Sequence, residues 1–549
     1  MPKHHVTADA CVDQVLSTVG KRLVVALPLG LGKPNRFINA LYARAKQDPS
    51  IDLEILTALT LQRPRPVGEL ERRFVGPMAE RLFDGYIDLD FVADRARDAL
   101  PDNVRVCEFF LLTGAFLGND GAQQDYISAN YTHAAKVILD RGANVLAQLV
   151  SACDEDGQTR YSLSCNPDIS LDIRPMLDAC RAEGRALAIV GEVNRELPFM
   201  VHDAEVPGEW FDHLIDVPGG DFPLFGVPHE PVVEADYAIA FHAAGLVRDG
   251  GTIQIGIGAL GTAICHALAL RQTDNAVFRD TLTALTVDRS RAVEAHAFDE
   301  GLYASSEMLV EGFLTLLRDG VLRRRVFQDV RLQRLARAGK MRAAPSLSLL
   351  EDLAAAGFGA PQLTAADTEL LRRHHILHPA VRLEGEVLVS PSGARHAARF
   401  DLPDARSTIA ADCLGDRIEG GILIHAAFFL GSSAFYEALR DMSPAERSAI
   451  AMTGVSYVNA LYGDEELKML QRPDARFLNT AMMVSLLGAA VSDAREDGRV
   501  VSGVGGQYNF VAQAPELPGA RSVLMVWATR SSGGALHSNI IWSYGHTTR

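Results

Sequence analysis

Glu307 stands at the end of a run of small residues in the segment GLYASSEMLVEGFLTLLRDG, which spans residues 301–320. The apolar residues that follow it recur at helical spacing, so we expect Glu307 in the first turn of a helix. A carboxylate in that position could simply complement the helix dipole. It would also stay ionised and point out of the end of a sheet, where it could act as a covalent nucleophile. The residues alone leave both roles open.

Three glycines crowd the segment SGVGGQYNF, where Gly503, Gly505 and Gly506 follow an expected strand and precede Gln507. A backbone that turns so sharply can present successive N–H groups to one oxygen, which is how an oxyanion is stabilised. A hairpin or a β-bulge would use the same glycines for a purely structural purpose. The glycine turn is therefore a candidate oxyanion site, with a structural turn as the alternative.

A second glycine loop, Gly256 to Gly261, has the letters G-x-G-x-x-G between an expected strand and an expected helix. Glycine lets the backbone approach a phosphate, and the helix start supplies N–H donors. A dinucleotide site also needs an acidic residue at the end of the next strand, about 20 residues on. Asp274 and Asp280 are present, but no clear strand ends on either. An NAD-linked oxidoreductase and a plain tight turn both remain alternatives.

Other catalytic signatures are missing from the sequence. It contains no G-x-S-x-G, no H-E-x-x-H and no Walker loop. Its seven cysteines are scattered, without a Cys-x-x-Cys pair, so we expect reduced thiols and neither a metal site nor a disulfide framework.

The same order of expected elements occurs twice in the chain, and these elements would position the residues named above. Residues 21–45 and 250–271 each run from a β-rich segment through a glycine loop into an amphipathic helix. The first loop also contains Lys33 and Arg36. An anion-binding site and a purely structural connection between strand and helix explain this loop equally well. Other strand-like runs are almost continuously apolar, which is typical of parallel sheets covered on both faces. We therefore expect an α/β protein with two related domains, residues 1–233 and 234–549.

The stretch from about 323 to 412 differs in character, being first basic and helical and then short, strand-like and turn-rich. We interpret residues 323–412 as an insertion in the second domain. A chain of 549 residues is in any case too long for one hydrophobic core.

Charge and hydropathy exclude several classes of partner. A net charge of −16 argues against nucleic acid as the main partner. No run of 18 uninterrupted apolar residues and no export signal is found, so we expect no membrane span and a cytoplasmic location.

Taken in order along the chain, QIGIGAL, GLYASSEMLVEGFLTLLRDGV and SGVGGQYNF resemble the motifs of the acetyl-CoA hydrolase and class I CoA-transferase family. The likeness covers most of the chain and implies two related open α/β domains with the active site between them. It places the family's nucleophilic glutamate on Glu307 and its Gly-Gly-Gln turn on Gly505, Gly506 and Gln507, just after Gly503. The remaining residues implied by the resemblance are the CoA-binding loop Gly256, Ile257, Gly258, Ala259 and Leu260, the oxyanion donor Asn459 in SYVNALYG, and Arg530 in ATRSSGG as the contact to CoA phosphate.

The activity implied by this resemblance is the transfer of CoA between an acyl-CoA, expected to be short-chain such as acetyl-CoA, and a carboxylic acid through a glutamyl-CoA thioester. CoA is then a substrate, no cofactor is permanently bound, and the partners are acyl-CoA and small carboxylates. The resemblance also leaves room for a homodimer. An acyl-CoA hydrolase using the same glutamate is the first alternative, and a CoA-binding protein without catalysis is a more distant one. The sequence departs from the family pattern at Asn509, where an aspartate is usual.

Overall fold

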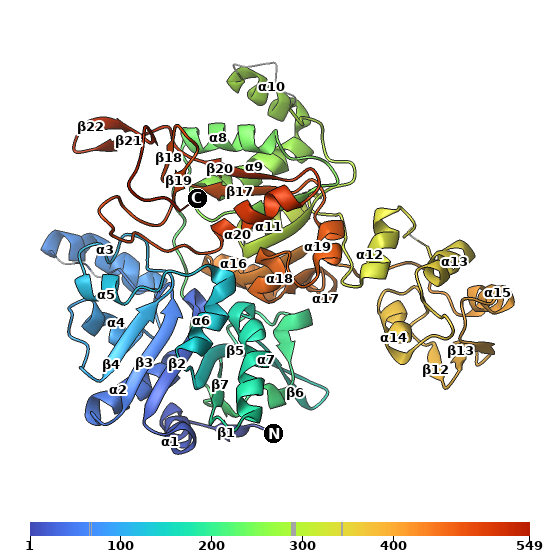
Figure 1. Ribbon diagram of the computed structural model, residues 1–549, viewed down its shortest axis with the longest axis horizontal. Helices are drawn as coiled ribbons and strands as arrows, with labels where there is room; N and C mark the ends of the chain where they lie inside the picture. The colour runs from blue at the N-terminus through green and yellow to red at the C-terminus, as the bar shows by residue number, and fades with distance from the viewer. Residues whose placement is uncertain (65, 67, 287–292, 342–343, 549) are drawn as a thin grey trace.

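The computed structural model describes residues 1–64, 66, 68–286, 293–341 and 344–548. Two α/β halves lie one above the other, the first in blue to teal and the second in green to red (Figure 1). Each half is built around a sheet whose main path is parallel, so the predicted α/β fold with parallel sheets is confirmed.

The sheet of the first half has the order β1-β9-β7-β5-β2-β3-β4; antiparallel to this path, β6 pairs with β5, and β8 pairs with β6. Its central strands are buried along nearly their whole length because helices cover both faces. The strands are β1 (Lys3–His5), β2 (Arg22–Leu29), β3 (Asp52–Ala58), β4 (Val104–Glu108), β5 (Val145–Glu155), β6 (Gln158–Ser162), β7 (Ala188–Val193), β8 (Glu205–Val206) and β9 (His213–Ile215). The helices are α1 (Ala8–Val19), α2 (Asn35–Gln47), α3 (Glu69–Leu82), α4 (Asp90–Arg95), α5 (Asp120–Gln124), α6 (Ala134–Asp140) and α7 (Asp168–Ala182).

The sheet of the second half has the order β16-β15-β11-β10-β17-β20, and all its pairings are parallel. Its strands are β10 (Thr252–Ile255), β11 (Tyr303–Leu309), β15 (Ile424–Phe429), β16 (Ile450–Met452), β17 (Arg476–Thr480) and β20 (Arg521–Met525). The helices are α8 (Glu234–Ala244), α9 (Ala259–Thr273), α10 (Asn275–Leu285), α11 (Glu311–Arg318), α16 (Ser433–Arg440), α17 (Pro444–Arg447), α18 (Val455–Asn459), α19 (Glu465–Gln471) and α20 (Gln507–Gln513). Short strands near the C-terminus complete this half: β18 (Met483–Ser485), β19 (Ala490–Val491), β21 (Thr529–Ser532), β22 (Ala535–Ser538) and β23 (Ile540–Ile541).

Strand order reverses at one point in each sheet. In the first half the chain moves from β2 outward through β3 and β4, and then returns to place β5 on the other side of β2. In the second half it moves from β10 outward through β11, β15 and β16, and then returns to place β17 beside β10. Ligands of open α/β sheets bind outside the carboxyl ends of the strands at such a switch point. The two glycine loops, after β2 and after β10, occupy these positions.

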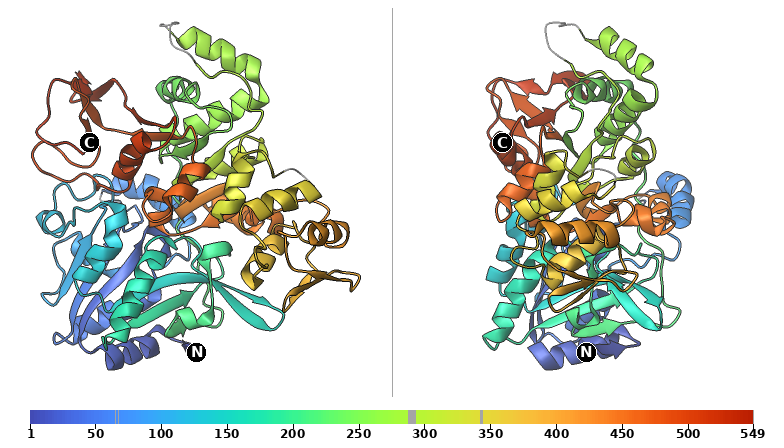
Figure 2. Two further views of the ribbon diagram at one scale, coloured as in Figure 1. Left: turned by 45° about the vertical axis from the view of Figure 1, so that its right-hand side comes forward. Right: turned by 90° about the vertical axis from the view of Figure 1, so that its right-hand side faces the viewer.

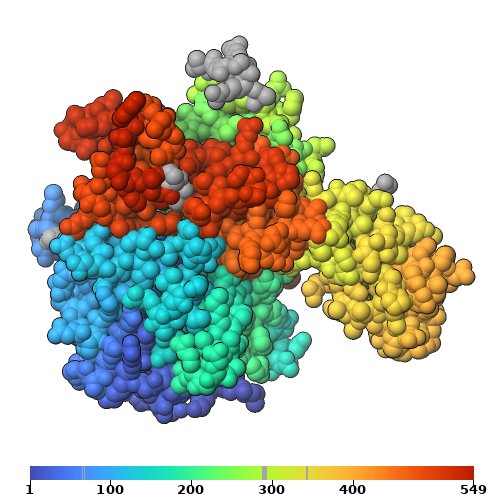
Figure 3. All heavy atoms as spheres, in the orientation of Figure 1, coloured from blue at the N-terminus to red at the C-terminus, as the bar shows by residue number. Residues whose placement is uncertain are grey.

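Residues between β11 and β15 form a lobe that projects from the second half (Figures 1 and 3). Its own hydrophobic cluster runs from Phe327 to Cys413, separate from the clusters of the two halves. Figure 2 shows the lobe, in yellow and orange, from two further sides. Its elements are α12 (Val330–Arg337), α13 (Leu347–Ala355), α14 (Ala365–Arg373), the antiparallel strands β12 (Arg382–Glu384), β13 (Val387–Val389) and β14 (Arg395–Ala397), and α15 (Pro403–Asp412).

A helix that spans a bilayer needs about 20 consecutive, mainly apolar residues. Within the described ranges, no helix combines the length and the apolar character needed to cross a membrane.

Candidate active site

Glu307 lies on a strand, and the prediction that it opens a helix is wrong. It belongs to β11, and α11 begins only at Glu311 with Val310 as its N-cap residue. The helical spacing of apolar residues was read correctly from Phe313 onward, but pairing with β10 and β15 on both sides holds residues 303–309 extended. Glu307 is therefore not part of the first turn of α11. Glu307 is the half-buried residue in a strand that is otherwise buried.

Asn459 and Gly506 meet Glu307 although the three residues are far apart in the sequence. Asn459 is fully buried at the end of α18, and its Nδ2 donates a hydrogen bond of 2.5 Å to Glu307 Oε2. The backbone of Gly506 approaches so closely that a Cβ built on it would overlap both the Glu307 carboxylate and the Asn459 amide. Residue 506 must be glycine for this carboxylate to lie where it does. Three residues proposed from sequence motifs thus form one cluster.

The glycine turn is held in place by the first half of the chain. Leu111 N donates to Ser502 O at 2.8 Å, and Tyr131 N donates to Gly505 O at 3.1 Å. A Cβ on Gly503 would lie within 3 Å of the backbone of Phe109 and Phe110, so only glycine permits this approach.

The backbone around the turn differs in part from expectation. Gly505 has φ +57°, a left-handed conformation that favours glycine. The strand expected before the turn is not formed, since Val500 makes only an isolated bridge with Ala494. The turn leads instead into α20, with Gly506 as the N-cap residue.

Tyr131 is a site residue that no sequence motif indicated. Its hydroxyl donates to Asp168 Oδ2, and its ring packs edge-on against Phe428 at a centroid distance of 6.1 Å. Burial, together with the charges of Asp168 and Glu307, raises the pKa of Tyr131 well above its ordinary value. Burial also raises the pKa of Asp168 to about 7. The phenol therefore stays protonated near Glu307, while the backbone N–H of Tyr131 holds the glycine turn.

A cavity of about 280 Å³ joins the carboxyl edges of the two sheets at this cluster. The first half contributes the ends of β2 and β3 together with Phe109 and Phe110 after β4. The second half contributes Glu307, the glycine turn and the ends of β10 and β17. The cavity therefore lies where the two switch points face one another, which is where this fold class binds ligands.

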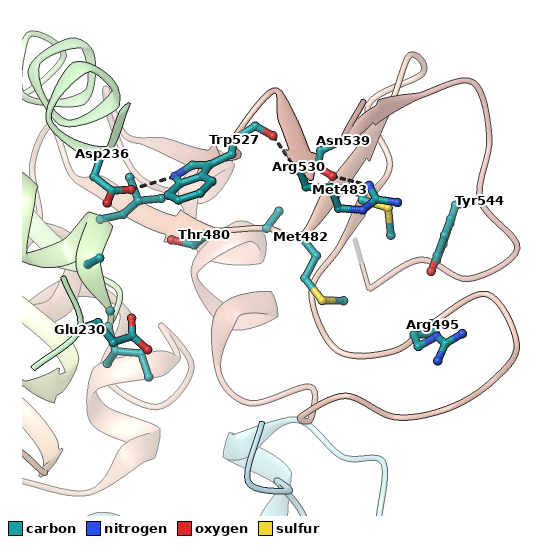
Figure 4. Close-up of a pocket in the computed structure, with 15 residues that line it drawn as sticks. Glu230, Asp236, Thr480, Met482, Met483, Arg495, Trp527, Arg530, Asn539 and Tyr544 are labelled. Atoms are coloured by element: carbon teal, nitrogen blue, oxygen red, sulfur yellow. Dashed lines mark hydrogen bonds between the residues drawn. The ribbon is translucent and has the colours of Figure 1, made fainter. Parts of the chain in front are cut away.

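The glycine loop after β10 lines a neighbouring cavity of about 650 Å³, shown in Figure 4. Gly258 has φ +95° and is the N-cap residue of α9, while Ala259 and Leu260 form its first turn. Arg530 on β21 reaches the same cavity, with its Nη1 donating to Asn539 Oδ1 at 2.5 Å. Ile257 and Thr480 line both cavities, so the two adjoin at these residues.

Several polar and aromatic residues of this second cavity were not predicted from the sequence. Trp527 lies over the loop with its indole Nε1 donating to Asp236 Oδ1 at 2.8 Å (Figure 4). Arg495 and Tyr544 lie across the cavity from it. No motif surrounds these residues, and only the packing of the C-terminal segments brings them to the loop.

Gln507 lines the smaller cavity next to Thr480. Its Nε2 donates to Thr480 O at 2.8 Å, and its Oε1 accepts from Ser492 Oγ at 2.8 Å. Its side chain therefore ties the glycine turn to the end of β17.

The first-half glycine loop has a structural role. Lys33 is buried, and its Nζ donates to the carbonyl oxygens of Gly30, Ala58 and Leu59. Burial lowers its pKa to about 7. Arg36 stacks on Phe222 with its guanidinium carbon 4.7 Å from the ring centre. Both side chains are engaged in contacts within the protein, which favours a purely structural connection between strand and helix over an anion-binding site.

The acidic residues considered for an NAD site are both on helix α10. Asp274 is the N-cap residue of α10 and accepts from Val277 N, while Asp280 lies within the helix. Neither ends a strand beside the loop, so the second half of the dinucleotide fingerprint is missing.

One group of potential metal ligands occurs among the described residues, away from the cavities. His5, Cys11 and His213 bring their ligand atoms within 4.8 Å of one another. His5 Nε2 and His213 Nδ1 are 3.1 Å apart, the length of a hydrogen bond between the two rings. This group was not predicted from the sequence, because its members are scattered over β1, α1 and β9.

One known protein is similar to part of this sequence, and solved structures are similar in fold over nearly the whole chain. A succinyl-CoA:cyclohexane-1-carboxylate CoA transferase of Geobacter metallireducens is 27% identical over 161 residues, which are 29% of this chain and 33% of the relative. RipA from Yersinia pestis superimposes with a TM-score of 0.54 at 18% identity, covering 98% of this chain and 84% of RipA. A 4-hydroxybutyrate CoA-transferase from Porphyromonas gingivalis superimposes with a TM-score of 0.50 at 15% identity. The superposition covers 99% of this chain and 86% of the transferase.

Residues 431–549 match the profile of the acetyl-CoA hydrolase/transferase C-terminal domain. This C-terminal part of the chain is therefore similar to the C-terminal domain of the acetyl-CoA hydrolase/transferase family. The match to the curated relative spans only one third of that relative's length, and the solved structures are similar in fold alone. The matched C-terminal domain of the family contains both Asn459 and the glycine turn.

Asn509 is the position at which the chain departs from the family pattern. Its Nδ2 donates to Thr132 Oγ1 of the first half at 3.1 Å, and the side chain is 9% exposed. A carboxylate there could only accept, so the hydroxyl of Thr132 would have to reverse its role. The substitution thus keeps a contact between the two halves behind the glycine turn.

Proposed function

We propose that this protein transfers CoA between an acyl-CoA and a carboxylate through a glutamyl-CoA thioester on Glu307. The observation that supports this most is the convergence of Glu307 Oε2, Asn459 Nδ2 and the Gly506 backbone in the cavity between the two sheets. A carboxylate held by an amide donor and a side-chain-free backbone is suited to attack a thioester carbonyl.

The proposed cycle balances without a further reactant. The Glu307 carboxylate attacks the thioester carbonyl, the C–S bond breaks, and a mixed anhydride and CoA thiolate result. The thiolate attacks the glutamyl carbonyl of the anhydride, which releases the first carboxylate and leaves the glutamyl-CoA thioester. An incoming carboxylate reverses both steps and leaves with the CoA.

Stabilising the tetrahedral oxygen is the main contribution expected of the protein. A carboxylate is a weak nucleophile, because its ordinary pKa is about 4.3. Asn459 and the N–H groups of Gly505 and Gly506 are the proposed donors to the developing oxyanion. Loss of one such donor typically costs about 2.7 to 4 kcal/mol of activation free energy.

The larger cavity is the proposed site of the CoA nucleotide. Its loop of Gly256, Ile257 and Gly258 precedes the α9 N-terminus, which supplies N–H donors for phosphate. Arg530 adds a cation and Trp527 an aromatic face in the same cavity. Because the two cavities adjoin at Ile257 and Thr480, the proposed path of the pantetheine arm to Glu307 runs past these two residues.

Replacing Arg530 by alanine is expected to lower kcat/KM for an acyl-CoA about 10-fold or more, because a hydrogen bond to a charged phosphate is lost. Steady-state kinetics with acyl-CoA and with the matching acyl-pantetheine will measure this effect. The loss should disappear with acyl-pantetheine, which lacks the nucleotide. Arg318→Ala, at an exposed position of α11, is the matched control. An equal loss with both substrates would show that Arg530 does not contact the nucleotide.

Hydrolysis is the alternative, with water in place of the acceptor acid. Both reactions use the same glutamate, and the difference lies in the access of water to the anhydride and the thioester. The predominantly apolar lining of the smaller cavity favours transfer.

Trapping the covalent intermediate tests the proposal. The protein is incubated with an acyl-CoA, treated with borohydride or hydroxylamine, digested and mapped by mass spectrometry. Modification at Glu307 is expected. An unmodified Glu307 in a preparation that turns over would refute the mechanism. Acyl-CoA binding without turnover would instead identify a CoA-binding protein that lacks catalysis, and NAD binding with a nicotinamide absorbance change would identify an oxidoreductase.

A further inference from the structure

The smaller cavity has two unlike sides. On the side of the second half it adjoins the larger cavity at Ile257 and Thr480, which is where the proposed function has the CoA arm enter. The acyl group lies on the other side of the thioester carbonyl and must extend toward the first half. That side is lined by Leu27, Leu29, Phe109, Phe110, Ala134 and Ile138.

This acyl side is apolar, and the cavity to which it belongs is larger than an acetyl group. The whole cavity measures about 280 Å³, roughly nine times the 30 Å³ that one water occupies in the liquid. Phe428 and Leu430 extend the apolar lining from the second half. An acetyl group would leave most of this apolar surface uncovered.

No cationic side chain is found among the described residues that line the smaller cavity. Among its described lining residues, Glu307 is the charged one. Lys33 lies close behind the wall, but its Nζ is directed to the carbonyl oxygens of Gly30, Ala58 and Leu59, and its side chain is 1% exposed. A second carboxylate on the acyl chain would therefore be buried without a counter-charge, which is strongly unfavourable.

The polar side chains of the wall are already paired within the protein. Gln254 and Asn479 hydrogen-bond one another through both amide groups, at 3.1 and 3.0 Å. Thr57 Oγ1 donates to Pro28 O, and the Tyr131 hydroxyl donates to Asp168. These groups select no polar substituent on the acyl chain.

We propose that the acyl group handled by this protein is an apolar monocarboxylic one, branched, alicyclic or aromatic, in preference to acetyl or a dicarboxylic acyl group. The inference rests on the proposed function and differs from the short-chain expectation drawn from the sequence. Each buried methylene in such a pocket changes kcat/KM about 10-fold or more.

A panel of acyl-CoA donors tests this in the half-reaction. The wild-type protein is mixed with acetyl-, isovaleryl-, cyclohexanecarbonyl-, benzoyl- or succinyl-CoA, and the formation of the Glu307–CoA adduct is followed by intact mass. At least one of the three apolar donors is expected to exceed acetyl-CoA about 10-fold, and to exceed succinyl-CoA about 100-fold or more, in second-order rate. Acetyl- or succinyl-CoA as the fastest donor, or equal rates for all five, would overturn the inference while leaving the proposed function intact. The absence of any adduct during turnover would instead refute the function.

A cation added to the wall should shift this preference. Ala129 is a half-buried loop residue that lines the cavity, and Ala129→Arg brings a guanidinium to it. The rate with succinyl-CoA, relative to the best apolar donor, should rise about 10-fold or more because the distal carboxylate gains a partner. Ala115→Arg, at an exposed position outside the lining, adds the same charge and should leave the ratio unchanged. An unchanged ratio in a folded Ala129→Arg protein would contradict the proposed position of the acyl chain.

Discussion

Glu307→Gln is expected to lower kcat by at least about 10⁴-fold, since removing the nucleophile of a covalent mechanism has effects of this size. Glutamine is nearly isosteric with glutamate, and its side-chain oxygen can still accept the hydrogen bond that Asn459 Nδ2 donates. The loss would therefore reflect chemistry and not misfolding. Steady-state turnover and intact-mass trapping with the same acyl-CoA measure it.

Thermal unfolding and acyl-CoA binding serve as controls for this variant, and both should match the wild-type protein. Glu307→Asp keeps a carboxylate but withdraws it by one methylene from Asn459 and Gly506. It should also lose most of the activity, because attack requires the reacting atoms to lie about 3 to 3.5 Å apart. If the kcat of Glu307→Gln stayed within roughly 10-fold of the wild-type value, another group would have to carry out the acyl transfer.

Gly506→Ala is expected to lower kcat about 10²-fold or more while leaving acyl-CoA binding nearly unchanged. The backbone of Gly506 has φ −103°, which alanine adopts without strain. The added methyl group would overlap the Glu307 carboxylate and the Asn459 amide, so one of them must move. Displacement of the nucleophile by about 1 Å is enough for a loss of this size.

Gly118→Ala is the matched control, because nothing lies within 4 Å of a Cβ at that position and its φ is not in the left-handed region. It should retain wild-type turnover. A crystal structure of Gly506→Ala would be expected to show Glu307 Oε2 moved from its 2.5 Å contact with Asn459. Normal turnover with the methyl group in place would mean that the carboxylate does not act from the position described here.

Local sequence patterns were sufficient to locate regular elements, but they did not always decide whether an element is a strand or a helix. Continuous apolar runs correctly predicted buried parallel strands, since such strands are covered on both faces. For Glu307 the local pattern was misleading, because small residues before a helical repeat fit a strand or a helix start equally well. Pairing of β11 with β10 and β15 decided the question, and no local pattern reports on such pairing.

The sequence by itself determined the α/β class, the position of the glycine loop between β10 and α9, and the set of residues whose chemistry suits acyl transfer. Only the tertiary structure decided that Glu307 and Asn459, 152 positions apart, share a hydrogen bond. It also decided that Tyr131 and the apolar wall of the first half complete the cavity. The physical reason is that periodicity reports on neighbours within a few residues, whereas convergence at a site depends on strand order and on the packing of one half against the other.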